Sequence, residues 1–167
     1  MSARLADFFR YNLWANQVLL DSCAPLTDAQ LDATAAGVYG SVRAILMHLF
    51  SSEESYAGRV GGQAPGSRLM ESDAFPGFDE LRRRAEQSGQ ALITFTEAAT
   101  EGDLTRILHL DDGTYDAPVY IVLIQAINHA IDHRSQIATV LSQQGIELPD
   151  LAGWGYNDAV LTPNNPK

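Results

Sequence analysis

Long segments with helical spacing constrain the fold of this 167-residue chain more than any other feature of its sequence. In each segment apolar residues recur every three or four positions, which places them along one face of an α-helix. The spacing predicts four long helices, at about residues 3–22, 41–60, 78–100 and 117–144. Long amphipathic helices bury their apolar faces against one another. We therefore expect an all-α fold, a four-helix bundle.

The ends of these helices carry recognisable signals. The tetrapeptide at residues 27–30, Thr-Asp-Ala-Gln, has the pattern of a capping box and predicts a short helical turn. Ser41 is the expected N-cap of the second long helix, and the two glycines at 61–62 should end it. Gly145 is the expected C-cap of the last long helix.

The connections between the helices differ in character. Residues 63–77 are rich in Gly, Pro, Ser and Asp and read as an exposed connection, long enough for a crossover or a functional lip. Alternating apolar residues around Asp-Gly at 105–115 predict a small β-hairpin before the last long helix. The last 20 residues read as an irregular tail, with Trp154 and Tyr156 as its anchors.

Composition is consistent with a single domain over residues 1–167 that needs no covalent support. The chain is 46% hydrophobic, enough for a proper core. Its one cysteine, Cys23, excludes an intramolecular disulfide, fits a reducing compartment, and is expected to be a small buried hydrophobe. The first residues have no secretory pattern and no apolar run reaches the length of a membrane span, so a cytoplasmic location is expected.

Charge argues against a nucleic-acid partner. Eleven basic residues against 21 acidic ones give a net charge of −10, which repels a phosphate backbone. The one short basic run, Arg82-Arg83-Arg84, has acidic neighbours and is interpreted as a solvated helix face. Neither a membrane nor a nucleic acid is therefore an expected partner.

Histidine positions carry the strongest chemical signal. His129 and His133 are four residues apart on the apolar stripe of the last long helix, so both rings project from one face. His48 lies in the second long helix, and facing helices of a bundle can bring side chains together in the core. Three protein ligands and an open position are typical of a catalytic metal. Spacing alone also allows core histidines that are only hydrogen-bonded.

Several other polar residues are candidates for supporting roles. Gln125 and Gln136 lie about one turn from the histidine pair, and Asn12 and Asn16 share the apolar stripe of the first helix. Any of these amides could orient a ring nitrogen. On a helix, such residues also commonly face solvent.

The remaining titratable groups are weaker candidates. Glu53 and Glu54 follow His48 by one to two turns, and a solvated face is the expected position of both. Asp132 should point well away from the two flanking histidines, and His109 should lie on the surface of the hairpin. The sequence contains no Ser-His-Asp elbow, Walker loop or dinucleotide fingerprint.

Three stretches together resemble the DinB/YfiT-like family. They are FRYNLWAN at residues 9–16, SVRAILMH at 41–48 followed by Glu53 and Tyr56, and NHAIDHRSQI at 128–137. The resemblance covers nearly the whole chain in the right order. Tyr56 is a departure, since relatives often have Trp there.

The resemblance implies a four-helix bundle with an up-down-down-up course. It also implies a divalent metal held by three histidines, matching His48, His129 and His133, and a homodimer. Zn²⁺ or Ni²⁺ is the expected ion, with Fe, Mn or Co as alternatives, because a three-nitrogen site binds several first-row metals.

Relatives in the family include thiol-dependent enzymes, namely a mycothiol-dependent isomerase and S-transferases that use bacillithiol or similar thiols. The leading hypothesis is therefore a metal-dependent thiol S-transferase that takes a small-molecule thiol and an electrophilic substrate. A metal-dependent hydrolase and a non-catalytic, stress-related metal-binding bundle are the alternatives. No residue is assigned a catalytic role beyond metal binding.

Overall fold

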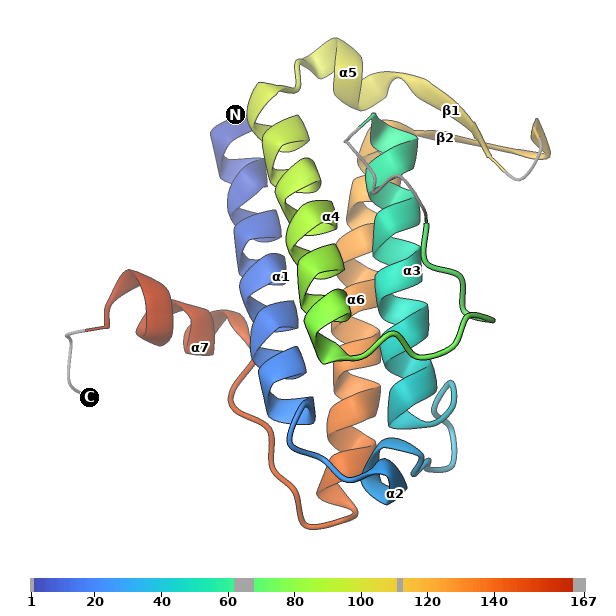
Figure 1. The fold of residues 1–167 in the computed structure, drawn as a ribbon. Helices are drawn as coiled ribbons and strands as arrows, with labels where there is room; N and C mark the ends of the chain where they lie inside the picture. Colours follow the sequence, from blue (N-terminus) through green and yellow to red (C-terminus); the bar gives the residue numbers. More distant parts are fainter. Residues whose placement is uncertain (1, 62–67, 111–112, 164–167) are drawn as a thin grey trace.

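Four long helices pack side by side in the computed structural model, which describes residues 2–61, 68–110 and 113–163 (Figure 1). They are α1 (Ser2–Cys23), α3 (Val42–Val60), α4 (Phe78–Ala98) and α6 (Val119–Ser142). Helix α1 packs mainly against α4, and α3 packs against both α6 and α4. The expected all-α bundle is confirmed, and each long helix begins and ends within about two residues of its expected limits.

The helices follow the up-down-down-up course that the resemblance implied. In Figure 1, α3 and α4 run in the same direction, and α1 and α6 run in the opposite one. Two consecutive parallel helices need a connection that returns along the length of the bundle. Residues 68–77, here called the return segment, make this passage beside α3. The expected crossover is thus confirmed, although residues 63–67 and Gly62 lie outside the described part of the chain.

Local signals at Thr27, Ser41 and Gly61 set helix ends as expected, whereas the C-cap of α6 is Gln143 and not the expected Gly145. Helix α2 (Asp28–Leu31) begins with a complete capping box between Thr27 and Gln30. The Ser41 side chain accepts a hydrogen bond from the backbone of Ala44 at the start of α3. Gly61 closes α3 with φ 97°, in the left-handed region that favours glycine.

The chain leaves α4 two residues earlier than expected. Thr100 forms a second capping box, with Asp103, and opens the short helix α5 (Glu101–Thr105), which the sequence analysis did not predict. The expected hairpin follows as strands β1 (Ile107–Leu110) and β2 (Tyr115–Pro118), paired antiparallel. Its turn residues Asp111 and Asp112 lie outside the described residues.

The C-terminal tail is more ordered than predicted. Helix α7 (Gly153–Tyr156) and the π-helix η2 (Asn157–Leu161) replace the expected irregular chain beside α1. Tyr156 is an anchor, with its ring 6.0 Å from that of Tyr11 and 5.4 Å from that of Trp14. The prediction for Trp154 is wrong, because this side chain is 78% exposed.

A glycine sets the distance between α1 and α4. A Cβ atom built on Gly89 would lie 2.9 Å from Cδ1 of Leu13, closer than van der Waals contact allows. Glycine in the middle of a helix costs about 1 kcal/mol relative to alanine, and here that cost accompanies a close helix approach. Leu13 is buried, whereas Phe8, also on α1, points into solvent and is 58% exposed.

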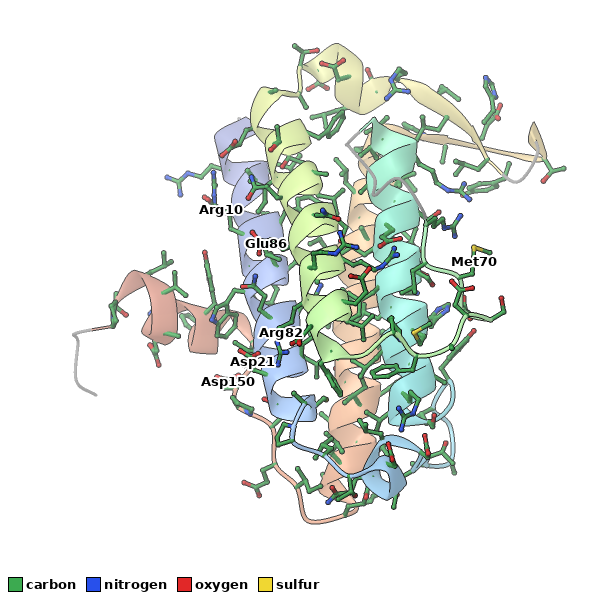
Figure 2. All side chains as sticks on the ribbon, in the orientation of Figure 1. Arg10, Asp21, Met70, Arg82, Glu86 and Asp150 are labelled. Carbon is green, nitrogen blue, oxygen red and sulfur yellow. The ribbon has the colours of Figure 1, made fainter. Side chains whose placement is uncertain are left out.

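Charged side chains cover the outside of the bundle (Figure 2). Arg82 links α4 to α1 by donating from Nε to Asp21 Oδ1 at 2.8 Å. The interpretation of residues 82–84 as a solvated face holds for Arg82 and Arg83 but fails for Arg84, whose side chain is only 11% exposed. None of the described helices is long and apolar enough to cross a membrane.

Candidate metal centre

Three histidines from two facing helices come together. His48 extends from α3, and His129 and His133 extend from α6, which packs directly against α3. Each ring offers a nitrogen, and these nitrogens all lie within 4.8 Å of one another. Nε2 of His48 is 2.9 Å from Nε2 of His129, so two ligand atoms already face the same point.

Burial favours the neutral form of His129 and His133, which is the form that binds a metal ion. His133 is only 5% exposed, and its Nδ1 has no hydrogen-bond partner within the described part of the chain. Burial, helped by the neighbouring histidines, lowers the pKa of His129 to about 4, and burial lowers the pKa of His133 as well. Both rings are therefore neutral at pH 7, which is the form that coordinates metals.

A carboxylate in the return segment orients His48. Oε1 of Glu71 lies 2.7 Å from Nδ1 of His48, and a carboxylate can only accept, so the imidazole donates from Nδ1. Nε2 of His48 is then left with a free lone pair on the side of the other two histidines. A histidine that donates its second nitrogen to a carboxylate is a recurrent arrangement at metal sites.

Tyr39 contacts both Glu71 and His48. Its hydroxyl donates to Oε2 of Glu71 at 2.6 Å, and its ring stacks on the imidazole of His48 with centroids 4.1 Å apart. The hydrogen bond from Tyr39, followed by that from His48, lowers the pKa of Glu71. The sequence analysis missed both Tyr39 and Glu71, because residues in two exposed connections carry no periodic signal.

The predicted supporting amides have different outcomes. Gln136 acts indirectly, since its Oε1 accepts a hydrogen bond from the backbone N–H of Tyr39 at 2.8 Å. Gln125 is exposed, and Asn12 and Asn16 are buried but bond to other groups. In the described part of the chain, Asn12 and Asn16 make hydrogen bonds to Glu53 and Arg134 and not to the histidine cluster.

Two of the weaker candidates are where they were expected. Asp132 is exposed, accepts a hydrogen bond from Gln136 Nε2 at 2.9 Å, and lies outside the histidine group. The His109 side chain is 72% exposed and pairs with Asp116 across the hairpin.

The prediction that Glu53 lies on a solvated face is wrong. Glu53 is 3% exposed and sits among α1, α3 and α4. Asn12 and Asn16 each donate from Nδ2 to its Oε2 at 2.8 Å, and the Ser88 hydroxyl donates to its Oε1 at 2.6 Å. Burial raises the pKa of Glu53, and these donors together with Arg134 oppose that rise. Its position is structural rather than part of the histidine cluster.

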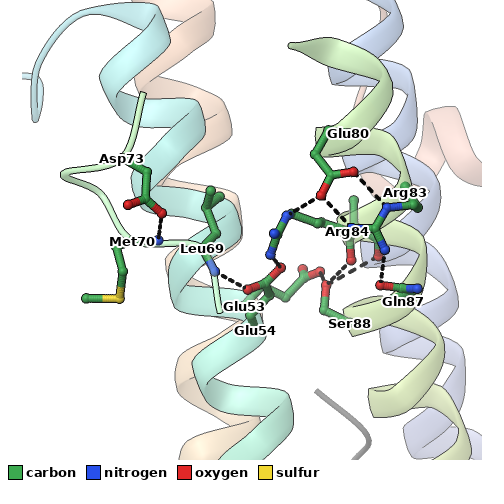
Figure 3. A network of polar contacts seen from close by, with 11 residues as sticks. Glu53, Glu54, Leu69, Met70, Asp73, Glu80, Arg83, Arg84, Gln87 and Ser88 are labelled. Atoms are coloured by element: carbon green, nitrogen blue, oxygen red, sulfur yellow. Dashed lines mark hydrogen bonds and ion pairs between the residues drawn. The ribbon is translucent and has the colours of Figure 1, made fainter. Parts of the chain in front are cut away.

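Glu54 is also buried, contrary to expectation, and it fixes the return segment (Figure 3). Its Oε2 accepts from the backbone N–H of Leu69 at 2.7 Å, and its Oε1 accepts from Nη1 of Arg84 at 2.9 Å. The bond to Leu69 lies two residues before Glu71. Glu54 therefore helps to place the carboxylate that contacts His48.

Cys23 is buried at the end of α1, as predicted. Burial raises the pKa of its thiol to about 12. Since the thiolate is the nucleophilic form, this residue is unsuited to catalysis at neutral pH.

The donor set fits a divalent transition-metal ion. Three imidazole ligands suit Zn, Ni, Cu, Co or Fe, and the described group contains no carboxylate. Nδ1 of His133 is a buried polar atom without a hydrogen-bond partner in the described part of the chain, and Nε2 of His48 and Nε2 of His129 face each other at 2.9 Å. A group of this kind could hold a metal ion while leaving coordination positions open.

Comparisons with known proteins identify the family and support the fold. The family model described as the DinB family matches residues 1–164. The structure is similar to a DinB-like protein from Bacillus cereus ATCC 10987, with a TM-score of 0.69 and 21% identity over 87% of this chain and 93% of that one. It is also similar to a DinB-like protein from Bacillus subtilis, YjoA, with a TM-score of 0.60 and 16% identity over 89% of this chain and 97% of that one. No curated protein matches the sequence.

Proposed function

This chain belongs to the DinB family, and we propose that it is a metal-dependent thiol S-transferase whose divalent ion is held by His48, His129 and His133. Its substrates would be a low-molecular-weight thiol and an organic electrophile. We further propose that it works as a homodimer in the cytoplasm, as the family resemblance suggests.

The convergence of three imidazoles from α3 and α6 carries this proposal. Their ligand atoms lie within 4.8 Å of one another, and no carboxylate completes the set within the described residues. A structural zinc site usually has four protein ligands, whereas a catalytic site has three. The histidine set therefore supports a role in chemistry rather than in folding.

The ion would supply positive charge that favours the thiolate form of a bound thiol over the thiol. The sulfur then forms a bond to the electrophilic carbon, the leaving group departs with its electron pair, and the thiol proton passes to solvent. Glu71 and Tyr39 contribute by fixing the ring of His48 so that its Nε2 faces the other two histidines. The lowered pKa values of His129 and His133 keep both rings neutral and ready to bind.

Two alternatives differ from this proposal in what happens at the histidines. In a metal-dependent hydrolase, water replaces the thiol as the nucleophile. In a non-catalytic binding bundle, metal is held without turnover. Both share the metal site, so metal binding and turnover need separate tests.

The metal site is tested by the metal content of untagged protein, measured by mass spectrometry. We expect about one equivalent of a first-row transition metal in the wild type and a large loss in His133→Ala. His109→Ala is the matched control, because His109 is exposed in the hairpin and should not alter metal content. A wild-type protein that stays metal-free after incubation with Zn²⁺ and Ni²⁺ would refute the proposal.

Turnover is tested by following thiol consumption and product formation together. Metal-loaded wild type should join a thiol to 1-chloro-2,4-dinitrobenzene faster than metal-free protein or His133→Ala does. Hydrolysis of ester substrates without thiol consumption would favour the hydrolase. Equal rates with and without metal across thiols and esters would favour the binding bundle.

A further inference from the structure

A pocket of about 400 Å³ lies beside the histidine cluster, between α3, α6 and the hairpin. Tyr56 joins the two sites, because it lines the pocket and its ring stands edge-on to the imidazole of His129, with centroids 5.7 Å apart. Gln125 lines the same pocket one turn before His129 on α6. A molecule with its reactive end at the histidines could therefore extend into this space.

The polar lining of the pocket is basic. Arg59 from α3 and Arg68 from the return segment both contribute, and no Asp or Glu is among the described lining residues. Arg59 is already engaged, since its Nε donates to the hydroxyl of Ser55 at 3.2 Å. Arg68 makes no hydrogen bond or ion pair to any residue in the described ranges and is exposed. In a chain of net charge −10, a pocket whose described lining holds two arginines and no carboxylate is a local departure.

Ser52, Ser55 and Gln125 are the other polar lining residues, and apolar side chains line the hairpin end of the pocket. Leu110, Ile121 and Val122 supply aliphatic surface, and Tyr115 supplies an aromatic ring. Arg59 follows His48 by three turns of α3, about 16 Å at the usual helical rise. The pocket thus places a cationic region and an apolar wall next to the histidine cluster, with Tyr56 between them, which is the complement of an elongated amphipathic anion.

We propose that this pocket binds the carboxylate of an organic anion with an apolar body, with Arg68 as its main cationic contact. The inference rests on the proposed function in naming the substrate class of the same site. Arginine suits the task because its planar guanidinium can form two parallel hydrogen bonds with one carboxylate. The carboxylate could belong to the thiol or to the electrophile, and the chemistry of recognition is the same for both.

Binding is tested by calorimetry with 4-phenylbutyrate and its neutral counterpart 4-phenyl-1-butanol, using metal-loaded protein. We expect the carboxylate to bind the wild type about tenfold more tightly than the alcohol, as one charge-assisted contact allows. Arg68→Gln should remove most of this difference and leave the affinity for the alcohol unchanged. Arg68→Lys should keep part of it, and Arg4→Gln, an exposed control on α1 outside the pocket, should keep all of it.

Three outcomes would overturn the proposal. They are equal affinity of the wild type for both ligands, absence of binding by the carboxylate, and an equal affinity for the carboxylate in wild type and Arg68→Gln. Carboxylate binding that survives in His133→Ala while turnover is absent in every variant would refute the enzyme proposal alone. The two failures are therefore distinguishable.

Turnover identifies which substrate carries the carboxylate. One pair is 3-mercaptopropionate with 1-chloro-2,4-dinitrobenzene, and the other is 2-mercaptoethanol with 4-chloro-3,5-dinitrobenzoate. In both, an S–C bond forms and chloride leaves with the electron pair. Arg68→Gln should raise KM about tenfold for the carboxylate of one pair with kcat little changed. An unchanged KM in both pairs would count against the pocket as a substrate site.

Discussion

Glu53 and Arg134 are opposite charges buried in one bundle interior, and two asparagines join them. Asn12 and Asn16 each donate from Nδ2 to Oε2 of Glu53 at 2.8 Å and accept at Oδ1 from Nη1 of Arg134 at 2.7 Å. The side-chain amide of each asparagine offers a donor toward the carboxylate and, on a separate atom, an acceptor toward the guanidinium. These hydrogen bonds satisfy much of the hydrogen-bonding capacity of both charged groups, which is the condition for burying them.

Asn16→Asp should destabilise the fold by about 3 kcal/mol, because it replaces a donor with a like charge against a buried carboxylate. Urea denaturation followed by circular dichroism at pH 7 measures the change in the free energy of unfolding. Asn128→Asp, the same substitution at an exposed position of α6, is the matched control and should change stability by less than ~0.5 kcal/mol. Equal effects in the two variants would show that the network contributes nothing specific.

Glu71→Gln should weaken metal binding by about 10- to 100-fold without unfolding the protein, because the amide orients His48 less strongly than the carboxylate does. Competition with a chromophoric chelator measures the affinity for Zn²⁺. Tyr39→Phe removes only the hydroxyl that contacts Glu71, so its effect should be smaller. Glu147→Gln, at an exposed position near the C-terminus, should bind Zn²⁺ as the wild type does.

Gly89→Ala should destabilise the bundle by about 1–3 kcal/mol, because the added methyl group overlaps Leu13 and outweighs the gain in helix propensity. Thermal or urea unfolding measures the loss. In a Leu13→Ala background the same substitution should cost less, since the overlapping Cδ1 is gone. Gly102→Ala in α5 should be tolerated, because the nearest atom to the added Cβ, Oγ1 of Thr100, would lie 3.7 Å away. Additive effects of Gly89→Ala and Leu13→Ala would contradict this account.

Metal-free protein should lose stability as the pH falls from about 6.5 toward 4. Burial holds the pKa of His129 at about 4 in the folded chain, below its ordinary value of 6.5. The unfolded chain therefore binds more protons in this window, and acidification favours unfolding. Urea midpoints measured in the presence of a chelator should fall between pH 7 and pH 4. In His129→Gln the fall should be shallower, and an identical slope in both proteins would assign it to other groups.

The periodicity of apolar residues was sufficient to predict the bundle, because a helix that buries one face carries an apolar residue on that face at every turn. The stripe through Val122, Ala126 and Ile137 contains both histidines of α6, and all three apolar residues are buried as expected. The capping signals at Thr27 and Ser41 were equally local, so they transferred directly to the structure. The capping box at Thr100 has the same pattern, but it was not predicted because apolar residues at helical spacing continue to Ala99.

The supporting contacts of the site could not be derived in this way. Glu71 and Tyr39 belong to connections far apart in sequence, and only tertiary packing brings them to His48. Glu53 was assigned to the surface because an isolated carboxylate is costly to bury. Its partners Asn12 and Asn16 were noticed as unusual on an apolar stripe, but only the tertiary structure shows that they donate hydrogen bonds to Glu53.

The return segment can change its sequence in evolution while the four-helix bundle stays the same. Its residues 68–73 supply Arg68 to the pocket and Glu71 to His48, and a single buried carboxylate, Glu54, fastens them to the scaffold. Under the two proposals above, grafting this short stretch between relatives would exchange ligand preference and metal affinity together while the four helices stay unchanged. Diversification of substrate use within such a bundle can thus proceed through a few connecting residues, without the risk of repacking the core.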